Sequence, residues 1–348
     1  MTEPLVSVCI RNFNCEKFLS YAIESALAQT YPRIEVIVLD DGSTDRSREV
    51  VARFADQVRS KFQKNQGMTA TGNRCFALAR GEIIIYLDSD DLLYPSAVTE
   101  VVRAWTSDTA KVQFQLAIID DDGHAKKGSR IPVYPPKYGP EEIRREFLAS
   151  GNYSWPPTSG NAYARRFLEK ILPLPLDHFH DGALNTIAPL FGEVRTIPQT
   201  LGCYRVHNTN AWAISTTAPA RFVAHIKQKQ KEMAFLRKYA ASAGVALPEG
   251  NLLNRLPHFL DLRLCALKLH QDYPGRAEDN GGRLGLLAVQ HIFRSDAGML
   301  RRLVLFVWSL ALAMSRGEVA HKLIALRFDP STRPMFINWA WESIRFHG

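Results

Sequence analysis

Three carboxylates stand together in the sequence LDSDD. Asp88, Asp90 and Asp91 directly follow the apolar run Ile83–Leu87, so the end of a predicted strand holds them within a few residues of one another. Hard divalent cations take such oxygen ligands, and a cation beside a diphosphate neutralises the charge that builds on it as a leaving group. The group therefore predicts a Mg²⁺ or Mn²⁺ site. The alternative is an Asp-rich turn that caps the helix expected to follow.

A second acidic pair opens the sequence DDGSTD. Asp40 and Asp41 also follow an apolar run, and Ser43 and Thr44 come just after them. A carboxylate here can accept a hydrogen bond from a nucleotide base or a ribose hydroxyl, while Ser43 or Thr44 can cap the next helix. A cap accounts for Ser43 but not for the paired acids, so we interpret the pair as part of a nucleotide site.

The elements that must position these acids alternate between short apolar runs and amphipathic segments. We expect strands over residues 5–10, 35–40 and 82–88, and helices over residues 16–29, 47–55 and 67–80. Apolar strands separated by helices are typical of a parallel sheet covered on both faces, in which ligands bind beyond the carboxyl ends of the strands. The polar clusters that end the three strands, RNFN, DDGSTD and DSDD, are therefore expected at one edge of the sheet.

The chain changes character beyond this sheet. An apolar run over residues 111–119 meets the turn sequence DDDG and is expected to form a hairpin with residues 131–133, before a Pro-rich loop with one short helix near residues 141–149. Later, helical periodicity dominates over residues 219–239, 252–270, 282–293 and 300–328. We predict a nucleotide-binding catalytic domain over residues 1–216 and a helical region over residues 217–348 that makes acceptor, membrane-surface or dimer contacts.

The 348 residues carry a formal net charge of +8 that is concentrated in the C-terminal third. Residues 1–219 hold 24 Lys and Arg against 25 Asp and Glu, whereas residues 220–348 hold 19 against 10. Such an excess favours contact with a lipid headgroup surface, a lipid-linked phosphate or nucleic acid, and the alternative is a solvated basic face. The balance of 46% hydrophobic and 22% charged residues excludes a disordered chain.

The five cysteines are odd in number and lack any CxxC pair, so neither a disulfide framework nor a structural zinc site is expected. No leader segment opens the sequence, and we expect the protein in the cytoplasm. The longest apolar stretch, Leu303–Met314, is shorter than the roughly 20 residues that cross a bilayer. With its basic flanks it predicts an interfacial element in residues 300–328 that docks on the inner membrane face, the alternative being a core or dimer-forming helical pair.

Four segments of the sequence resemble a known family in order and spacing. They are VSVCIRNFN at residues 6–14, DDGSTD at 40–45, NQGMTATGN at 65–73 and LDSDD at 87–91. Together they resemble the inverting glycosyltransferases of family 2, strongly over residues 4–105, fairly to residue 210 and not beyond. The resemblance implies the fold called GT-A, a Rossmann-like, mostly parallel α/β sheet flanked by helices, here followed by a mainly helical C-terminal appendage.

The resemblance also implies roles for individual residues on the donor side. Phe13 stacks near the base, Asp41 accepts a hydrogen bond from it, and Asp88 contacts the ribose. Asp90 binds the divalent metal, Mn²⁺ or Mg²⁺, with Asp88 and His207 of the sequence GCYRVHNTN as further ligands. The remaining donor-binding candidates are Arg11, Asp40, Ser43, Ser89 and, as a diphosphate contact, Arg205.

The catalytic base of such enzymes is an acidic residue that opens a helix in the second half of the domain. Asp181 in LDHFHDGALNTI occupies this place and would deprotonate the acceptor hydroxyl, with Asp177 as the other candidate. The alternative role for Asp181 is a helix cap. The segment TSGNAYARR is similar to the family's acceptor side, which implies acceptor contacts at Ser159, Gly160, Asn161 and, just upstream, Trp155.

Three positions depart from the family pattern. Arg11 stands where the family has Pro, Gly72 where it has Arg, and His180 where it has the Glu before the base. The change at Gly72 removes a contact to the donor that the family pattern implies. Arg74 lies two residues away, and on a helix it would face elsewhere.

We therefore predict an inverting glycosyltransferase that moves a sugar from a nucleotide diphosphate sugar, UDP-sugars first among them, to a hydroxyl of a glycan or lipid-linked saccharide. Cell-surface polysaccharide or glycoconjugate biosynthesis is the expected setting, a homodimer is one option, and no nucleic-acid partner is expected. A nucleotidyltransferase is a rival, but it needs a phosphate loop rich in Gly, Arg and Lys that RNFN does not provide. A non-catalytic scaffold that binds membrane or nucleic acid is the other rival.

Overall fold

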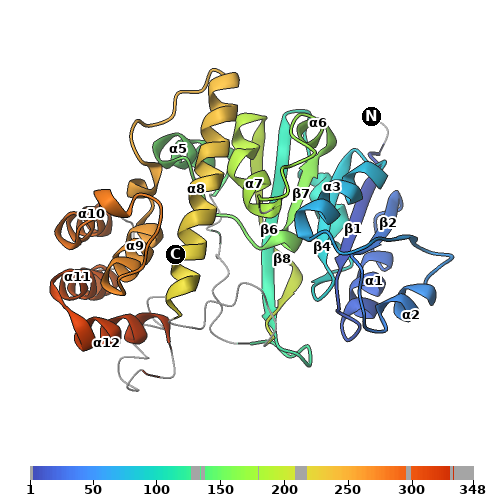
Figure 1. Cartoon of the computed structure of the whole chain (residues 1–348). Coiled ribbons are helices and arrows are strands. Elements are labelled where there is room, and N and C mark those ends of the chain that lie inside the picture. Colours follow the sequence, from blue (N-terminus) through green and yellow to red (C-terminus); the bar gives the residue numbers. More distant parts are fainter. Residues whose placement is uncertain are drawn as a thin grey trace. The chain divides into compact units, whose positions relative to one another are not determined.

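The computed structural model of the chain (Figure 1) describes residues 3–126, 134, 138–178, 180–207, 218–294, 299–329 and 332. The chain divides into two compact units. The first, called the sheet unit, comprises Met1–Phe147, Tyr153–His207 and Tyr239–Val245. The second, called the helical unit, comprises Leu148–Asn152, Asn208–Lys238 and Ala246–Gly348. The two units are therefore interleaved along the chain, whereas the sequence suggested a single boundary near residue 217.

The sheet unit is built on an eight-stranded mixed sheet with the strand order β3-β2-β1-β4-β7-β6-β8-β5. Strands β1 to β4 are parallel, β7 runs antiparallel to both β4 and β6, β8 is parallel to β6, and β5 is antiparallel to β8. The strands are β1 Val6–Asn12, β2 Ile34–Asp40, β3 Arg59–Phe62, β4 Ile83–Asp88, β5 Leu92–Leu93, β6 Thr109–Ile119, β7 Asn161–Ala164 and β8 Glu193–Arg205.

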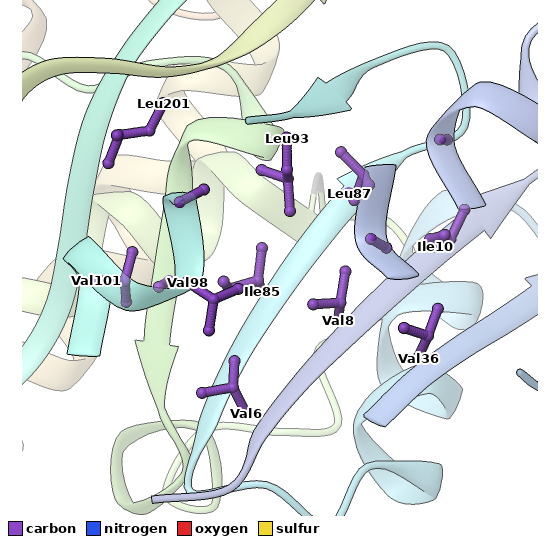
Figure 2. Close-up of a cluster of buried hydrophobic side chains, with 14 of the residues drawn as sticks. Val6, Val8, Ile10, Val36, Ile85, Leu87, Leu93, Val98, Val101 and Leu201 are labelled. Atoms are coloured by element: carbon purple, nitrogen blue, oxygen red, sulfur yellow. The ribbon is translucent and has the colours of Figure 1, made fainter. Parts of the chain in front are cut away.

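The two faces of the sheet follow from the alternation of side chains along β1 and β4. Val6, Val8 and Ile10 point to one face and pack with residues of β4 against helices α1, α2 and α4, as Figure 2 shows for part of this core. Cys9 and Arg11 point to the other face, which α3 and α7 cover. Because β1, β2 and β4 are almost entirely buried, their continuous apolar runs predicted them correctly.

The helices of this unit connect and cover the strands (Figure 1). They are α1 Leu19–Leu27, α2 Ser47–Ala52, α3 Met68–Leu78, α4 Ala97–Arg103, α5 Pro140–Ser150, α6 Arg165–Leu168 and α7 His180–Ile187, with the 3₁₀ turns η1 Thr158–Gly160 and η2 Ala188–Leu190. The end of α5 already belongs to the helical unit. The DDDG sequence forms the expected turn, with an isolated bridge between Ile119 and Ala125, but residues 131–133 of the predicted hairpin lie outside the described residues.

The helical unit contains most of α8 (Pro219–Ser242) and all of α9 (Pro257–Lys268), α10 (Gly281–Arg294), α11 (Met299–Met314) and α12 (Gly317–Phe328), with the 3₁₀ turns η3 (Leu252–Arg255) and η4 (Arg276–Glu278). The helical stretch predicted over residues 300–328 is two helices, because Arg316 is extended and Gly317 has a positive φ of 54°. Trp308 of α11 joins them by donating a hydrogen bond to the carbonyl of Leu323 at 2.8 Å. None of the helices in the described part of the chain has the length and hydropathy needed to cross a membrane.

Candidate active site

The carboxyl ends of β2, β1 and β4 meet at one edge of the sheet. The strand register sets Asn12 of β1 opposite Asp40 of β2, and Arg11 of β1 opposite Asp88 of β4. The acidic ends of β2 and β4 are therefore both direct neighbours of the polar end of β1, as the sequence predicted. Parallel pairing causes this, because it brings like ends of strands together.

Asp40 organises the loop that follows β2. Its two carboxylate oxygens accept hydrogen bonds from the backbone N–H of Ser43 (2.9 Å), the hydroxyl of Ser43 (2.6 Å) and the side-chain amide of Asn12 (2.7 Å). Gly42 within this turn has a φ of 81°, and an added Cβ would lie 2.6 Å from the backbone nitrogen of Asn65. The hydrogen bonds of Asp40 and Ser43 thus stabilise the turn itself. Direct contact of these two residues with the nucleotide-sugar donor stays a prediction.

Asp41 and Phe13 differ sharply in exposure. Asp41 is 4% exposed and accepts hydrogen bonds from the backbone N–H groups of Gln66 (2.9 Å) and Gly67 (2.8 Å) and from the amide of Gln63 (2.6 Å). It therefore closes the loop that leads into α3. Phe13 is 50% exposed just beyond β1, where an aromatic ring is open to stack on a planar base.

The DSDD turn after β4 buries one carboxylate and presents another. Asp91 is fully buried and accepts hydrogen bonds from the Ser159 hydroxyl (2.5 Å) and the Arg205 backbone N–H (2.9 Å). Burial raises the pKa of Asp91, and the charges of Asp90 and Asp88 raise it further. Asp91 is thus the internal anchor of the turn, while the Asp90 side chain is 21% exposed and lies 2.9 Å from Nε2 of His207.

Arg205, the predicted diphosphate contact, lies beneath the DSDD turn. Its side chain is used inside the protein: Nε donates to the carbonyl of Asp90 (2.9 Å), Nη1 donates to the carbonyl of Asp120 (2.9 Å), and the guanidinium lies 4.5 Å from the ring centre of Phe18. The residue is only 3% exposed. Arg205 therefore fixes the backbone under Asp90, which its residue type alone could not reveal, and its contact with a diphosphate stays a prediction.

The ligand types needed for a divalent cation are present around Asp90. The Asp90 carboxylate is a ligand type that both Mn²⁺ and Mg²⁺ take, whereas the His207 imidazole, 2.9 Å away, suits a transition metal such as Mn²⁺ better than Mg²⁺, so the residues fit the Mn²⁺ option best. Asp88 is turned instead toward Arg11, its ion-pair partner. A different group in the described part of the chain brings three ligand atoms within 4.8 Å of one another. It consists of Asp120, Asp122 and His124, on the largely exposed turn after β6.

Arg11 is a buried cation between two carboxylates. Its side chain is 4% exposed and pairs with Asp88, which is 28% exposed. Burial alone lowers the pKa of Arg11, but Asp88 and Asp181 raise it more, so that the guanidinium stays charged. Two of its nitrogen atoms, Nε and Nη1, have no hydrogen-bond partner. Asp88 and Asp181 therefore face one shared positive charge.

Asp181 lies in the first turn of α7 rather than before it. Its Oδ1 accepts the backbone N–H of Gly182 (2.9 Å) and its Oδ2 the hydroxyl of Thr158 (3.3 Å). The contact with Thr158 places Asp181 near the carboxyl end of β4, because the hydroxyl of the next residue, Ser159, accepts the backbone N–H of Asp88 at 3.1 Å. The charge of Asp181 also raises the pKa of Arg11. Asp177 is 63% exposed and pairs with the neighbouring His178 at 3.0 Å. The geometry thus favours Asp181 as the base.

The three departures from the family pattern meet in one place. The His180 ring is fully buried, 4.4 Å from the ring centre of Tyr86, and an added Cβ at Gly72 would lie 2.8 Å from its Cγ and closer still to Cδ2 and Nε2. The guanidinium of Arg11 lies 5.6 Å from the ring centre of the same Tyr86. His180 therefore occupies the space that a larger residue at position 72 would need, and Arg11 supplies a cation there.

Helix α3 also holds the segment that leads to Asp181. The side chain of Asn73 makes two hydrogen bonds of 2.9 Å with the backbone of Leu174: Nδ2 donates to the Leu174 carbonyl, and Oδ1 accepts the Leu174 N–H. The hydroxyl of Thr69 donates to the carbonyl of His178. We did not predict these positioning residues; the only signal was the polar character of NQGMTATGN on a helix that otherwise faces the core.

The predicted acceptor contacts at Ser159, Gly160 and Asn161 are not supported. All three residues are buried. Ser159 links the Asp88 backbone to Asp91, Asn161 donates to the carbonyls of Pro156 and Pro157, and an added Cβ at Gly160 would lie 2.8 Å from Pro156. Ser89, a predicted donor contact, is also buried, at 7% exposure. Asn161 opens β7, the strand between β4 and β6, and Ser159 and Gly160 lie in the turn η1 just before it, so these residues support the DSDD turn from inside the protein.

Trp155 remains a candidate acceptor contact. It is half-buried, and its ring lies 5.2 Å from that of Tyr153 in an edge-on arrangement. Its predicted stacking on a sugar is not tested by this contact.

Comparison with known proteins identifies the family. The sequence profile of glycosyl transferase family 2 matches residues 7–172, which contain the ends of β1, β2 and β4. The chain belongs to glycosyltransferase family 2. An uncharacterized glycosyltransferase of Nostoc sp. is 38% identical over 214 residues, 59% of this chain and 66% of that protein. Chondroitin synthase of Escherichia coli is 38% identical over 137 residues, 38% of this chain and 20% of that protein.

Solved structures show that this family 2 chain shares a GT-A-like fold. S. aureus TarS 1-349 in complex with UDP superposes with a TM-score of 0.53 at 16% identity, covering 98% of this chain and 89% of that one. A mannosyltransferase from Pyrobaculum calidifontis, in complex with GDP-Man and Mn²⁺, gives 0.52 at 16% identity, covering 99% and 85%. The chain spans less than two thirds of the length of the two curated relatives named above.

Proposed function

We propose that this chain transfers a sugar from a nucleotide diphosphate sugar to an acceptor hydroxyl, with inversion at the anomeric carbon. The observation that carries the proposal is the gathering of Asp88, Asp90 and Asp181 over the ends of β1 and β4, in a chain of glycosyltransferase family 2. The two alternative functions considered from the sequence, a nucleotidyltransferase and a non-catalytic scaffold, explain this arrangement less well. Neither requires the carboxylate of Asp181 at this edge of the sheet.

On the donor side, the exposed ring of Phe13 stacks on the base, and the loop closed by Asp41 forms the wall of the base pocket. A uridine nucleotide is our first choice of donor, supported by the UDP complex of the TarS structure. Asp88, held by Arg11, accepts from the ribose.

On the metal side, Asp90 and His207 hold Mn²⁺ or Mg²⁺, with Asp88 as a further ligand. The Mn²⁺ in the mannosyltransferase structure supports this choice of metal. Such a cation, when bound, neutralises the charge that develops on the leaving diphosphate. Arg205 keeps the backbone of Asp90 in place through the Asp90 carbonyl, and the Asp90 carboxylate and His207 would hold the cation there.

On the acceptor side, Asp181 removes the proton from the attacking hydroxyl, with the positive charge of Arg11 close by. We further propose a glycan or lipid-linked saccharide as the acceptor, in the assembly of a cell-surface polysaccharide, a setting that the match to chondroitin synthase supports. The protein would then work at the cytoplasmic side of a membrane.

The test combines nucleotide binding with two matched metal-site variants. Thermal unfolding is followed with UDP, GDP, TDP and CDP, each with Mn²⁺ and with a chelator, because a ligand that binds only the folded protein raises its melting temperature. We expect one nucleotide to stabilise the protein with Mn²⁺ only. Asp90→Asn should abolish this stabilisation, whereas Asp122→Asn, in the other acidic group, should keep it. A shift that survives in Asp90→Asn and disappears in Asp122→Asn would move the metal site to the β6 turn.

A further inference from the structure

Helix α11 presents a continuous apolar stripe to solvent. Five of its side chains are between 44% and 86% exposed, and their spacing of three or four residues puts them on one side of the helix: Met299, Leu303, Val307, Leu310 and Met314. On the opposite side Trp308 and Leu312 are buried in the helical unit. A helix on the surface of a soluble protein normally turns charged residues outward, so an exposed apolar stripe of this kind indicates an interaction surface.

The stripe continues onto α10. Phe293 is 61% exposed, and its ring lies 5.8 Å from that of Phe306 on α11, while Leu286, two turns earlier on α10, is 60% exposed. The helices approach closely because Gly285 faces Ala313. We call these seven exposed side chains of Leu286, Phe293 and the α11 stripe the α10–α11 face. It holds half of the exposed large hydrophobic residues in the described part of the chain, so they are concentrated rather than scattered.

The charge around this face indicates what covers it. Residues 281–329 contain seven Lys and Arg against three Asp and Glu. Arg283, early in α10, and Arg316, just after α11, are both exposed, at the end where Gly281 of α10 approaches Ala313 of α11. Two copies of this face packed together would bring two basic rims into contact, which is unfavourable. An anionic lipid surface satisfies both the apolar stripe and the basic rim.

We propose that the α10–α11 face docks on a bilayer that contains anionic lipid, with both helices lying in the plane of the interface. The apolar side chains enter the boundary of headgroups and acyl chains, and the arginines pair with lipid phosphates. None of the described helices can span a bilayer, so the contact is peripheral. The inference stands on the helical unit and does not depend on the sugar transfer proposed for the sheet unit.

The experiment is flotation of the full chain with vesicles of phosphatidylcholine, with and without phosphatidylglycerol, at low and high salt. We expect binding that requires phosphatidylglycerol and weakens with salt. Leu303→Glu/Val307→Glu should reduce the bound fraction at least about tenfold, because charge enters the apolar contact. Arg283→Gln/Arg316→Gln should weaken binding about five-fold for each charge removed at low salt. Tyr21→Glu, at a 55% exposed aromatic of the sheet unit, is the matched control and should bind normally.

Two further measurements keep the outcomes distinct. Circular dichroism melting checks that each variant is folded, and the nucleotide-dependent thermal shift should be the same in Leu303→Glu/Val307→Glu as in the unmodified chain, so that failure of donor binding is separate from failure of membrane binding. Sedimentation that shows a dimer dissociated by Leu303→Glu/Val307→Glu would overturn the proposal in favour of a second copy. A monomer that floats with neither kind of vesicle would overturn it as well.

Discussion

Replacing Gly72 by Ala is expected to destabilise this protein while His180 is present and to stabilise it once His180 is removed. Two effects oppose each other in the single variant. Alanine in place of glycine within a helix such as α3 stabilises by about 1 kcal/mol. Against this, the new Cβ would lie 2.8 Å or less from three atoms of the His180 ring, where ordinary contacts begin near 3.4 Å.

The His180 ring has little freedom to move away. It is fully buried, packs edge-on against Tyr86 at 4.4 Å and belongs to the first turn of α7. Overpacking of this kind costs about 1–3 kcal/mol, so the single variant should lose about 1 kcal/mol net. In a His180→Ala background the collision disappears and the helix gain of about 1 kcal/mol remains. The two positions should therefore be coupled by about 2 kcal/mol, as contacting residues are.

Calorimetric melting of the four proteins in this cycle measures the coupling. For a domain of this size class 1 kcal/mol corresponds to about 2–4 °C in Tm, so Gly72→Ala should lower Tm by about that amount in one background and raise it in the other. Gly282→Ala in α10 is the control, because an added Cβ there meets nothing nearer than 3.5 Å. A change of the same sign in both backgrounds would falsify the claim that His180 fills the space over Gly72.

Two other predictions concern Asp181 and Lys111. Asp181→Asn should lower kcat by about 10²- to 10⁴-fold without changing the nucleotide-dependent thermal shift, whereas Asp177→Asn should remain close to normal; the opposite ranking in a nucleotide-release assay would reassign the base. Burial lowers the pKa of Lys111, which contacts Gln113 and Tyr153, well below its ordinary value. Between that lowered pKa and the unfolded value of about 10.4 the unfolded chain binds more protons than the folded one, so stability relative to Lys111→Met should rise as the pH increases toward about 10. A stability difference independent of pH would show that Lys111 keeps its proton throughout.

The parts of the fold that could be predicted are those in which local pattern and burial agree. The runs in β1, β2 and β4 are continuous and apolar, so both their existence and the neighbouring position of their tips followed from the sequence. Strand β3 was missed because RSKF is short and polar and lies at the sheet edge with alternating exposure. Strands β5 and β7, of two and four residues, are too short for any periodicity to appear.

The direction in which a motif residue faces was less predictable. The sequence places Ser159 and Arg205 in segments typical of the family, but burial turns both toward the backbone of the DSDD turn. Hydroxyl and guanidinium groups serve equally well as ligand contacts and as internal supports, so residue type alone does not separate the two roles. Only the packing around them does.

The sequence by itself determined the family, the strands that carry the acids and the edge at which those acids meet, because strand pairing and alternation act locally along the chain. The tertiary structure decided the rest. His180 occupies the space above Gly72 beside Arg11, and α11 buries Trp308 and Leu312 while its apolar stripe is exposed. Both features depend on contacts between segments far apart in the sequence, and the periodicity of a single segment carries no information about such contacts.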